Sequence, residues 1–212
     1  LSSLFGTLYN TLFCTFPQAA SQAGFYFPSL DIVLYGEFSV DDKTPFGPFA
    51  ATYLTDWFGE PFADETCRAA HPNLKDACWS VSVLYDYIEA PLFVAENRFD
   101  QNQIGSILGL DWWPFKNATK GEEYKEYFGK IMVDAVQKVV ESPKGDGLFL
   151  PSCYDHTGNL CMTDTSTRVQ NYSFAQALHN WYFNETNVPI HLIDTCNNVS
   201  KVDGPCNPNC QC

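Results

Sequence analysis

Positive charge is scarce in this sequence. The chain of 212 residues carries 12 lysines and arginines against 25 aspartates and glutamates, so its formal net charge is −13. Such a surface repels the phosphates of nucleic acids and of anionic membranes, and no cluster of basic residues offsets that repulsion. The composition therefore excludes nucleic acid as an expected partner.

Long apolar runs and a signal peptide are also missing. No stretch of 18 apolar residues occurs, so we predict no membrane span. The chain opens directly on LSSLFGTLYNTLFCTF, with neither a basic region nor a small-residue cleavage site. Its apolar residues recur at helical spacing. A core helix at the first residue indicates a chain that begins partway through a larger fold, so we expect a separate N-terminal segment of that fold.

Methionine is rare, with two residues, whereas cysteine occurs nine times. Oxidising compartments tolerate so many cysteines as disulfides, while the cytosol rarely does. We expect Cys67 and Cys78 to close a small loop, and further bridges to hold the cysteine-rich tail from residue 196 onward. An odd count leaves one thiol to pair with a missing segment. Four N-glycosylation sequons lie at Asn117, Asn171, Asn184 and Asn198. These features together predict a secreted, disulfide-bonded glycoprotein.

What the sequence does contain is a folded α/β pattern. Apolar residues make up 45% and aromatics 16%, which argues against disorder. Buried strands are predicted over residues 29–40, 90–95, 147–151 and 188–193. Helices are predicted over residues 45–58, 122–141 and 174–182. This alternation is typical of a mostly parallel sheet flanked by helices. We treat residues 1–212 as part of one domain.

An acidic residue and a histidine follow two of these predicted strands. Asp100 lies just past the strand over 90–95, and His156 lies just past the strand over 147–151. Loops at the carboxyl ends of parallel strands emerge at one edge, so the spacing permits a hydrogen-bonded pair. An α/β-type serine hydrolase needs an acid and then a histidine, in that chain order. The alternative reading is a turn or cap aspartate and an ordinary polar histidine.

Four segments carry a resemblance to a known family. They are PLFVAENRFDQNQI at 91–104, GLFLPSCYDHTGN at 147–159, FAQALHNWYF at 174–183 and PCNPNC at 205–210. In this order they resemble the successive C-terminal signatures of the pectin acetylesterases and the related Notum carboxylesterases. The resemblance implies the C-terminal part of an α/β-hydrolase fold, with Asp100 as the acid and His156 as the base of a catalytic triad. We expect no cofactor and no metal, because the other histidines lack metal-ligand spacing.

The nucleophile is the part of the triad that the sequence does not supply. The family's serine sits in a Gly-x-Ser-Ala-Gly-Gly turn, and no G-x-S-x-G occurs here. Ser3 in LSSLFGT is the nearest candidate, but Leu4 and Phe5 are bulky for a strained turn, and a helix N-cap is the alternative. The family's glycine-rich oxyanion segment is absent as well. Either the serine lies on a separate N-terminal portion, or the turn has degenerated and the protein is a pseudoenzyme.

The resemblance implies a secreted carboxylic ester hydrolase that acts by a Ser-His-Asp mechanism. Acetyl esters on a cell-wall polysaccharide are the expected substrate, with this chain supplying the acid and the base. Two alternatives remain open at this point. One is a Notum-like deacylase of a lipidated protein, and the other is a non-catalytic extracellular glycoprotein that uses the same scaffold for assembly.

Overall fold

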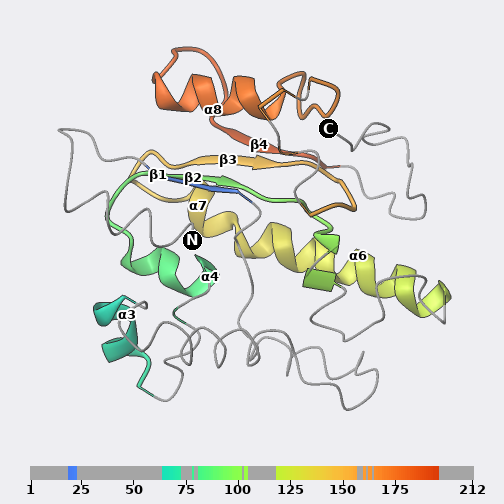
Figure 1. Ribbon diagram of the computed structural model, residues 1–212, viewed down its shortest axis with the longest axis horizontal. Coiled ribbons are helices and arrows are strands. Elements are labelled where there is room, and N and C mark those ends of the chain that lie inside the picture. The colour runs from blue at the N-terminus through green and yellow to red at the C-terminus, as the bar shows by residue number, and fades with distance from the viewer. Residues whose placement is uncertain are drawn as a thin grey trace.

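A parallel sheet with helices on both faces forms the centre of the molecule (Figure 1). The computed structural model describes residues 19–22, 64–72, 78, 81–101, 103–104, 118–156, 160, 162–163 and 165–195. Several sequence predictions lie outside these residues: the opening helix, the strand over 29–40, the helix over 45–58 and the bridged tail.

The sheet has four parallel strands in the order β1-β2-β3-β4. They are β1 (Ala19–Gln22), β2 (Leu92–Ala95), β3 (Gly147–Leu150) and β4 (His191–Ile193). The predictions of strands over 90–95 and 147–151 are confirmed, and the last strand begins three residues later than the 188–193 predicted. Strand β1 was not predicted, because its Ala-Ala-Ser-Gln sequence has little intrinsic preference for a strand.

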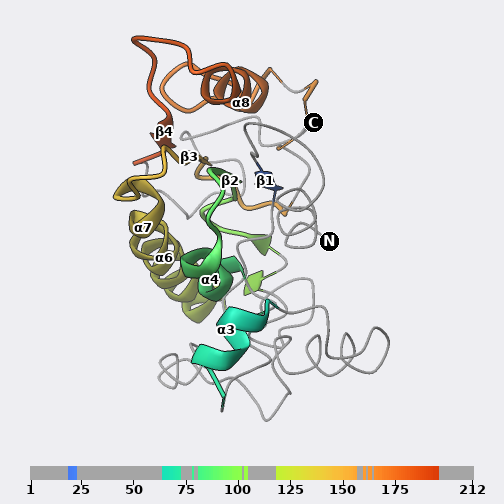
Figure 2. The same ribbon diagram turned by 90° about the vertical axis from the view of Figure 1, so that its left-hand side faces the viewer.

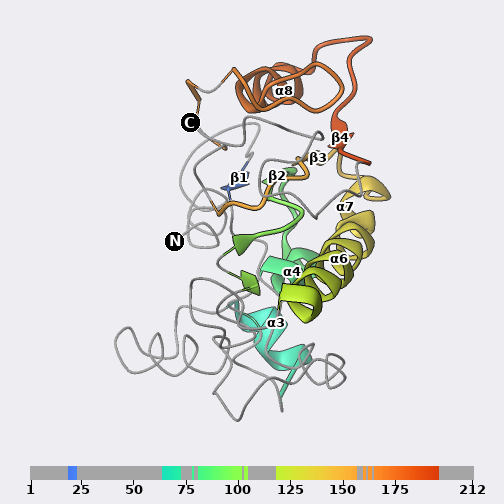
Figure 3. The same ribbon diagram turned by 90° about the vertical axis from the view of Figure 1, so that its right-hand side faces the viewer.

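Helices α6 (Ala118–Ala135) and α7 (Gln137–Val140) cover one face of the sheet, and α8 (Phe174–Tyr182) covers the other (Figure 2 and Figure 3). The shorter helices α3 (Glu65–Ala70), α4 (Val81–Leu84) and η4 (Tyr85–Tyr87) precede β2. One helix was predicted over 122–141, but the structure divides it at Val136. There the backbone has φ −81° and ψ −3°, and Val139 N–H donates to the Val136 carbonyl in a tighter turn.

Alternate residues of the strands point to opposite faces of the sheet. Leu92, Val94, Leu148 and Leu150 face α6 and α7, where Phe128, Met132, Val136 and Val139 form one buried stripe. Phe93, Phe149 and Leu192 face α8, where they pack on Phe174, Ala177 and Trp181. All four positions of β2 and of β3 are buried. Both strands therefore read as unbroken apolar runs, as expected for a sheet covered on both faces.

Helix α8 begins and ends where the sequence predicts. Ser173 caps it, because the Ser173 hydroxyl accepts from Gln176 N–H while the Gln176 side chain accepts from Ser173 N–H, at 3.0 Å. The predicted Cys67–Cys78 disulfide is confirmed. Cys153 is disulfide-bonded as well.

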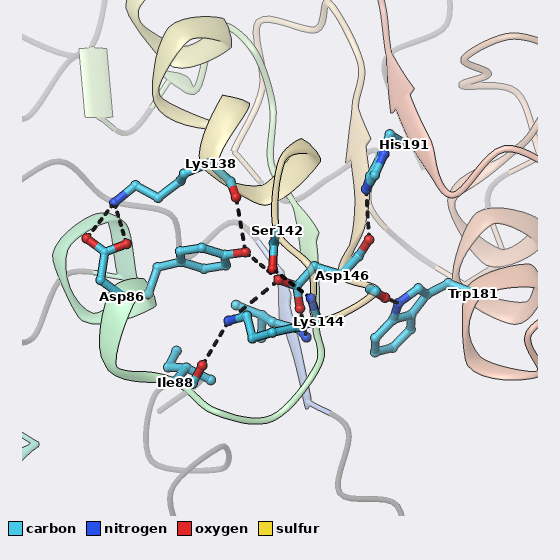
Figure 4. A network of polar contacts seen from close by, with 11 residues as sticks. Asp86, Ile88, Lys138, Ser142, Lys144, Asp146, Trp181 and His191 are labelled. Carbon is cyan, nitrogen blue, oxygen red and sulfur yellow. Dashed lines mark hydrogen bonds and ion pairs between the residues drawn. The ribbon is translucent and has the colours of Figure 1, made fainter.

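A buried carboxylate anchors the amino-terminal edge of the sheet (Figure 4). Asp146 directly precedes β3 and is fully buried. Its Oδ1 accepts from Leu92 N–H at 2.6 Å, and its Oδ2 accepts from the Tyr85 hydroxyl. The Lys144 ammonium lies 3.5 Å from the same Oδ2 and also donates to the Ile88 carbonyl at 2.8 Å. The carboxylate therefore ties the start of β2 to the start of β3.

The backbone next to this carboxylate holds two further elements. His191 of β4 contacts the Asp146 carbonyl through Nε2 at 2.9 Å, and Trp181 of α8 donates from Nε1 to the Gly145 carbonyl at 2.8 Å. Gly147 is required at the start of β3, because a Cβ there would stand 2.4 Å from the Phe93 ring. The short turn before β3 thus sets the positions of β2 and β4, the strands on either side of β3, and of α8.

We expect Asp146→Asn to destabilise the protein strongly. The amide leaves the Lys144 ammonium without its charge partner, and breaking a buried ion pair costs about 3 kcal/mol. Asp86→Asn is the matched control, because the Asp86 side chain is 61% exposed and pairs with Lys138 at 3.2 Å. Exposed pairs contribute little, so the control is expected to match the parent within about 0.5 kcal/mol. Urea unfolding of both variants measures the difference, and equal losses would contradict the anchoring role.

The phenol of Tyr85 gives a pH test of the same network. Burial, followed by the hydrogen bond to Asp146, raises the pKa of Tyr85 well above its usual value. The folded state therefore favours the neutral phenol, whose contribution is complete below about pH 10 and is lost at higher pH. We expect the parent to lose its stability advantage over Tyr85→Phe as the pH rises above about 10. Unfolding free energies of both proteins at pH 8 and in the alkaline range measure this, and a constant difference would contradict it.

Candidate active site

Two loops run side by side beyond the carboxyl ends of β2 and β3. The backbone hydrogen bonds between them run from donors after β2 to carbonyls at the end of β3 and beyond it. The donor–acceptor pairs are Glu96–Phe149 at 3.2 Å, Arg98–Pro151 at 3.0 Å, Phe99–Cys153 at 3.3 Å and Gln101–Asp155 at 3.3 Å. The parallel pairing of the strands thus continues past the sheet, and it carries residues 100 and 156 to the same place.

The structure brings Asp100 and His156 together. His156 Nδ1 lies 2.9 Å from Asp100 Oδ2. The Asp100 side chain is fully buried, whereas 31% of the His156 side chain is exposed. Because an ionised carboxylate can only accept, this contact places a proton on Nδ1 and makes Nε2 the basic nitrogen of the neutral ring. The imidazole is thereby held in the tautomer that a general base needs.

The surroundings of the pair favour a charged imidazole. Burial lowers the pKa of His156, but the hydrogen bond to Asp100 and the charges of Asp100 and Asp155 raise it, and the net effect is a raised pKa. A proton accepted by His156 is therefore stabilised by the carboxylate that orients the ring.

Gln103 holds the Asp100 carboxylate in place. Its backbone N–H donates to Asp100 Oδ1 at 2.9 Å, and its side-chain Nε2 lies 3.5 Å from Oδ2. Ile104 N–H donates to the Asp100 carbonyl at 2.9 Å, so Asp100 also caps the helical turn that follows it. The reading of Asp100 as a cap residue is thus correct for one oxygen, and it leaves the other oxygen for His156.

Asn97 and Arg98 fix the loops that carry the pair. The Asn97 side chain donates to the His156 carbonyl at 3.1 Å. Arg98 donates from Nε to the Gly129 carbonyl in α6 at 3.2 Å, and from Nη1 to the Asp194 carbonyl just past β4 at 3.3 Å. Both side chains are buried, and so is Gln103. The roles of these three residues were not predicted from the sequence; the available signal was a strongly polar run, 96–103, next to a buried strand.

The remaining predicted site residues are placed as follows. Ser3, Asn117 and Asn198 lie outside the described residues. Asn171 and Asn184 are exposed. Among the residues that the structure describes, no group of three metal-ligating side chains occurs, and no helix is long and apolar enough to span a membrane.

Comparison with known families identifies what kind of chain carries this pair. The family model described as Pectinacetylesterase matches residues 18–211. The chain belongs to the pectinacetylesterase family. Pectin acetylesterase 5 of Arabidopsis thaliana is 32% identical over 167 residues, which cover 71% of this chain and 36% of that protein. Pectin acetylesterase 4 of the same plant is 32% identical over 140 residues, or 65% of this chain and 31% of that protein. The chain thus spans about a third of each relative's length.

The fold has a counterpart among solved structures. The Wnt deacylase Notum from Drosophila superposes with a TM-score of 0.63 at 19% sequence identity, over 85% of this chain and 46% of that chain. The predicted α/β-hydrolase fold, with a mostly parallel sheet flanked by helices, is confirmed. At this level of identity the likeness shows the fold alone.

We expect Asp100→Asn to move the pKa of His156 from above to below the usual histidine value of about 6.5. The substitution removes the carboxylate that raises this pKa and leaves the burial that lowers it. Histidine-selective NMR titration of the parent and the variant measures the change, with His156→Gln to assign the signal. Asp155→Asn is the control, with a smaller shift in the same direction.

The same pair carries a stability contribution with a defined sign. Because the folded-state pKa of His156 is raised, that contribution is complete below about pH 6.5 and falls as the pH rises through the folded-state value.

An unchanged His156 titration in Asp100→Asn would show that the 2.9 Å contact does not govern this histidine.

Proposed function

We propose that the protein containing this chain is a secreted carboxylic ester hydrolase that works by a Ser-His-Asp mechanism. The observation that carries the proposal is the contact between Asp100 and His156 at the carboxyl edge of a parallel sheet. Membership of the pectinacetylesterase family supports acetyl esters of a cell-wall polysaccharide as the substrate. We further propose that the chain is the C-terminal portion of one hydrolase domain.

The geometry supports a defined role for each residue. His156 Nε2 accepts the proton of a serine hydroxyl while the serine oxygen attacks the ester carbonyl. His156 then gives this proton to the departing alcohol, which leaves an acyl-serine. Water attacks the acyl-serine, its proton passes to Nε2 and on to the serine oxygen, and the carboxylic acid leaves. Asp100 stays ionised throughout and stabilises the imidazolium that forms twice in the cycle.

The serine is the open component of this proposal. This sequence holds no Gly-x-Ser-x-Gly, so the nucleophile is either Ser3, in an unusual setting, or a serine of a portion outside these 212 residues. The acid–base pair supports the attack of the serine and the departure of the alcohol, but it does not identify the serine. A fluorophosphonate probe followed by peptide mass spectrometry identifies it directly, because the probe labels an activated serine covalently.

We expect His156→Ala to abolish ester hydrolysis by the full-length protein, since the serine loses its base. Asp100→Asn is expected to lower kcat by about 10⁴, the loss that follows from the wrong tautomer in other triads. His179→Ala is the matched control and is expected to leave the rate unchanged, because His179 is exposed on α8. Rates on p-nitrophenyl acetate, p-nitrophenyl octanoate and acetylated pectin measure these effects, and circular dichroism checks the fold.

The outcomes separate the open alternatives. Preference for acetate and release of acetate from pectin support the polysaccharide deacetylase. Preference for octanoate supports the alternative of a Notum-like deacylase of a lipidated protein; the Notum neighbour is named as a Wnt deacylase. No turnover by the intact parent, together with no probe labelling, contradicts the enzyme and supports a non-catalytic extracellular scaffold.

A further inference from the structure

Two large aromatic side chains stand exposed at the end of α8. Tyr182 is 55% and Phe183 is 62% exposed, although large apolar side chains are ordinarily covered. Their rings contact each other edge to face with centroids 5.0 Å apart, and the His179 ring lies 4.6 Å from Phe183. The three rings thus form one continuous aromatic surface, which we call the α8 aromatic patch.

The α8 aromatic patch lies away from the acid–base pair. Its neighbour Trp181 is buried and bonds to Gly145, in the turn before β3, so this end of α8 is at the amino edge of the sheet (Figure 1 and Figure 4). Asp100 and His156 follow the carboxyl ends of the strands. A group that covers the patch therefore leaves the candidate active site open.

Asn184 directly follows the patch in a rigid turn. Its φ is +51°, Asn184 N–H donates to the Trp181 carbonyl at 3.2 Å, and Glu185 N–H donates to the Asn180 carbonyl at 2.9 Å. These are the two bonds of a Schellman cap, in which asparagine is favoured after glycine at the left-handed position. The cap accounts for Asn184, but it accounts neither for Thr186, which completes the Asn-Glu-Thr sequon, nor for the exposed rings.

We propose that Asn184 carries an N-linked glycan whose first N-acetylglucosamine packs on Tyr182 and Phe183. The cap fixes Asn184 beside the rings, and Asn184 and Thr186 are both exposed. A pyranose offers a face of C–H groups to an aromatic ring, so the sugar covers apolar surface while its hydroxyls stay in water. The inference rests on the secretion that belongs to the proposed function.

Thr186→Ala tests the glycan without touching the cap, because it destroys the sequon and leaves Asn184 in place. Thr186→Ser keeps the sequon and is its matched control. The full-length protein is secreted from a eukaryotic cell, and its glycans are trimmed enzymatically to one N-acetylglucosamine. Peptide mass spectrometry is expected to show sugar on Asn184 in the parent and in Thr186→Ser, and none in Thr186→Ala.

The contact with the rings is tested by a double-mutant cycle on melting temperature. Thr186→Ala is expected to lower Tm by about 1–2 °C in the full-length parent, because about 1 kcal/mol shifts Tm less in a domain that is larger than this chain. In a Tyr182→Ser, Phe183→Ser background the same change is expected to have no effect. Asn171→Asp is the second control: it removes a sequon whose asparagine is exposed but follows no pair of exposed rings. Aspartate also tolerates the left-handed backbone at this position, where φ is +73°, so Tm should change little.

Three results would overturn the inference. They are an unmodified Asn184 in the secreted parent, equal Tm losses in both backgrounds, and a parent glycosylated at Asn184 that binds polysaccharide through Tyr182 and Phe183. None of these readouts uses ester hydrolysis. If the protein is inactive but shows the expected double-mutant cycle on Tm, the glycan inference is supported and the proposed ester hydrolase is contradicted. If the protein is active but carries no glycan on Asn184, the ester hydrolase is supported and the glycan inference is contradicted.

Discussion

The continuation of parallel pairing beyond the sheet is the constraint on which the candidate site depends. A strand pair fixes only the backbones inside it, yet here four backbone bonds from donors after β2 to carbonyls at the end of β3 and beyond it extend the alignment as far as Gln101 and Asp155. The side chains of residues 100 and 156 are then adjacent for the same reason that the strands are adjacent. A carboxylate and an imidazole whose placement derives from main-chain bonds are held with little freedom, which is the condition for directed proton transfer.

The amino and the carboxyl ends of the parallel strands carry two buried carboxylates with different roles. At the amino edge, the buried Asp146 joins the starts of β2 and β3, and its neighbouring backbone holds β4 and α8. At the carboxyl edge, Asp100 is equally buried, but its partner His156 is partly exposed. A buried charge whose partners are mostly enclosed serves as an anchor, whereas one paired with an accessible titratable ring has a chemical use. The geometry thus distinguishes Asp146 from Asp100, although both are aspartates next to buried strands.

The sequence was sufficient for the elements whose signal is local. Strands β2 and β3 are short apolar runs, α8 has its capping box, and Asp100 and His156 follow strand ends. The parts that it missed depend on long-range contacts. Strand β1 has no propensity of its own, and Gln103 and Asn97 acquire their roles only when the two loops align. The break at Val136 is likewise invisible to helical periodicity, because the apolar stripe runs through it.

The form of the acid–base pair bears on whether the parent protein is an enzyme. Burying a carboxylate is costly, and a buried ion pair seldom stabilises a protein more than apolar side chains of the same size would. Asp100 meets that cost with donors from Gln103 on both oxygens, although its role as a cap would need only one of them. The second oxygen holds His156, whose ring is 31% exposed and adds little apolar burial. A scaffold without ester chemistry gains little from such an arrangement, so the pair itself supports catalysis over a purely structural role.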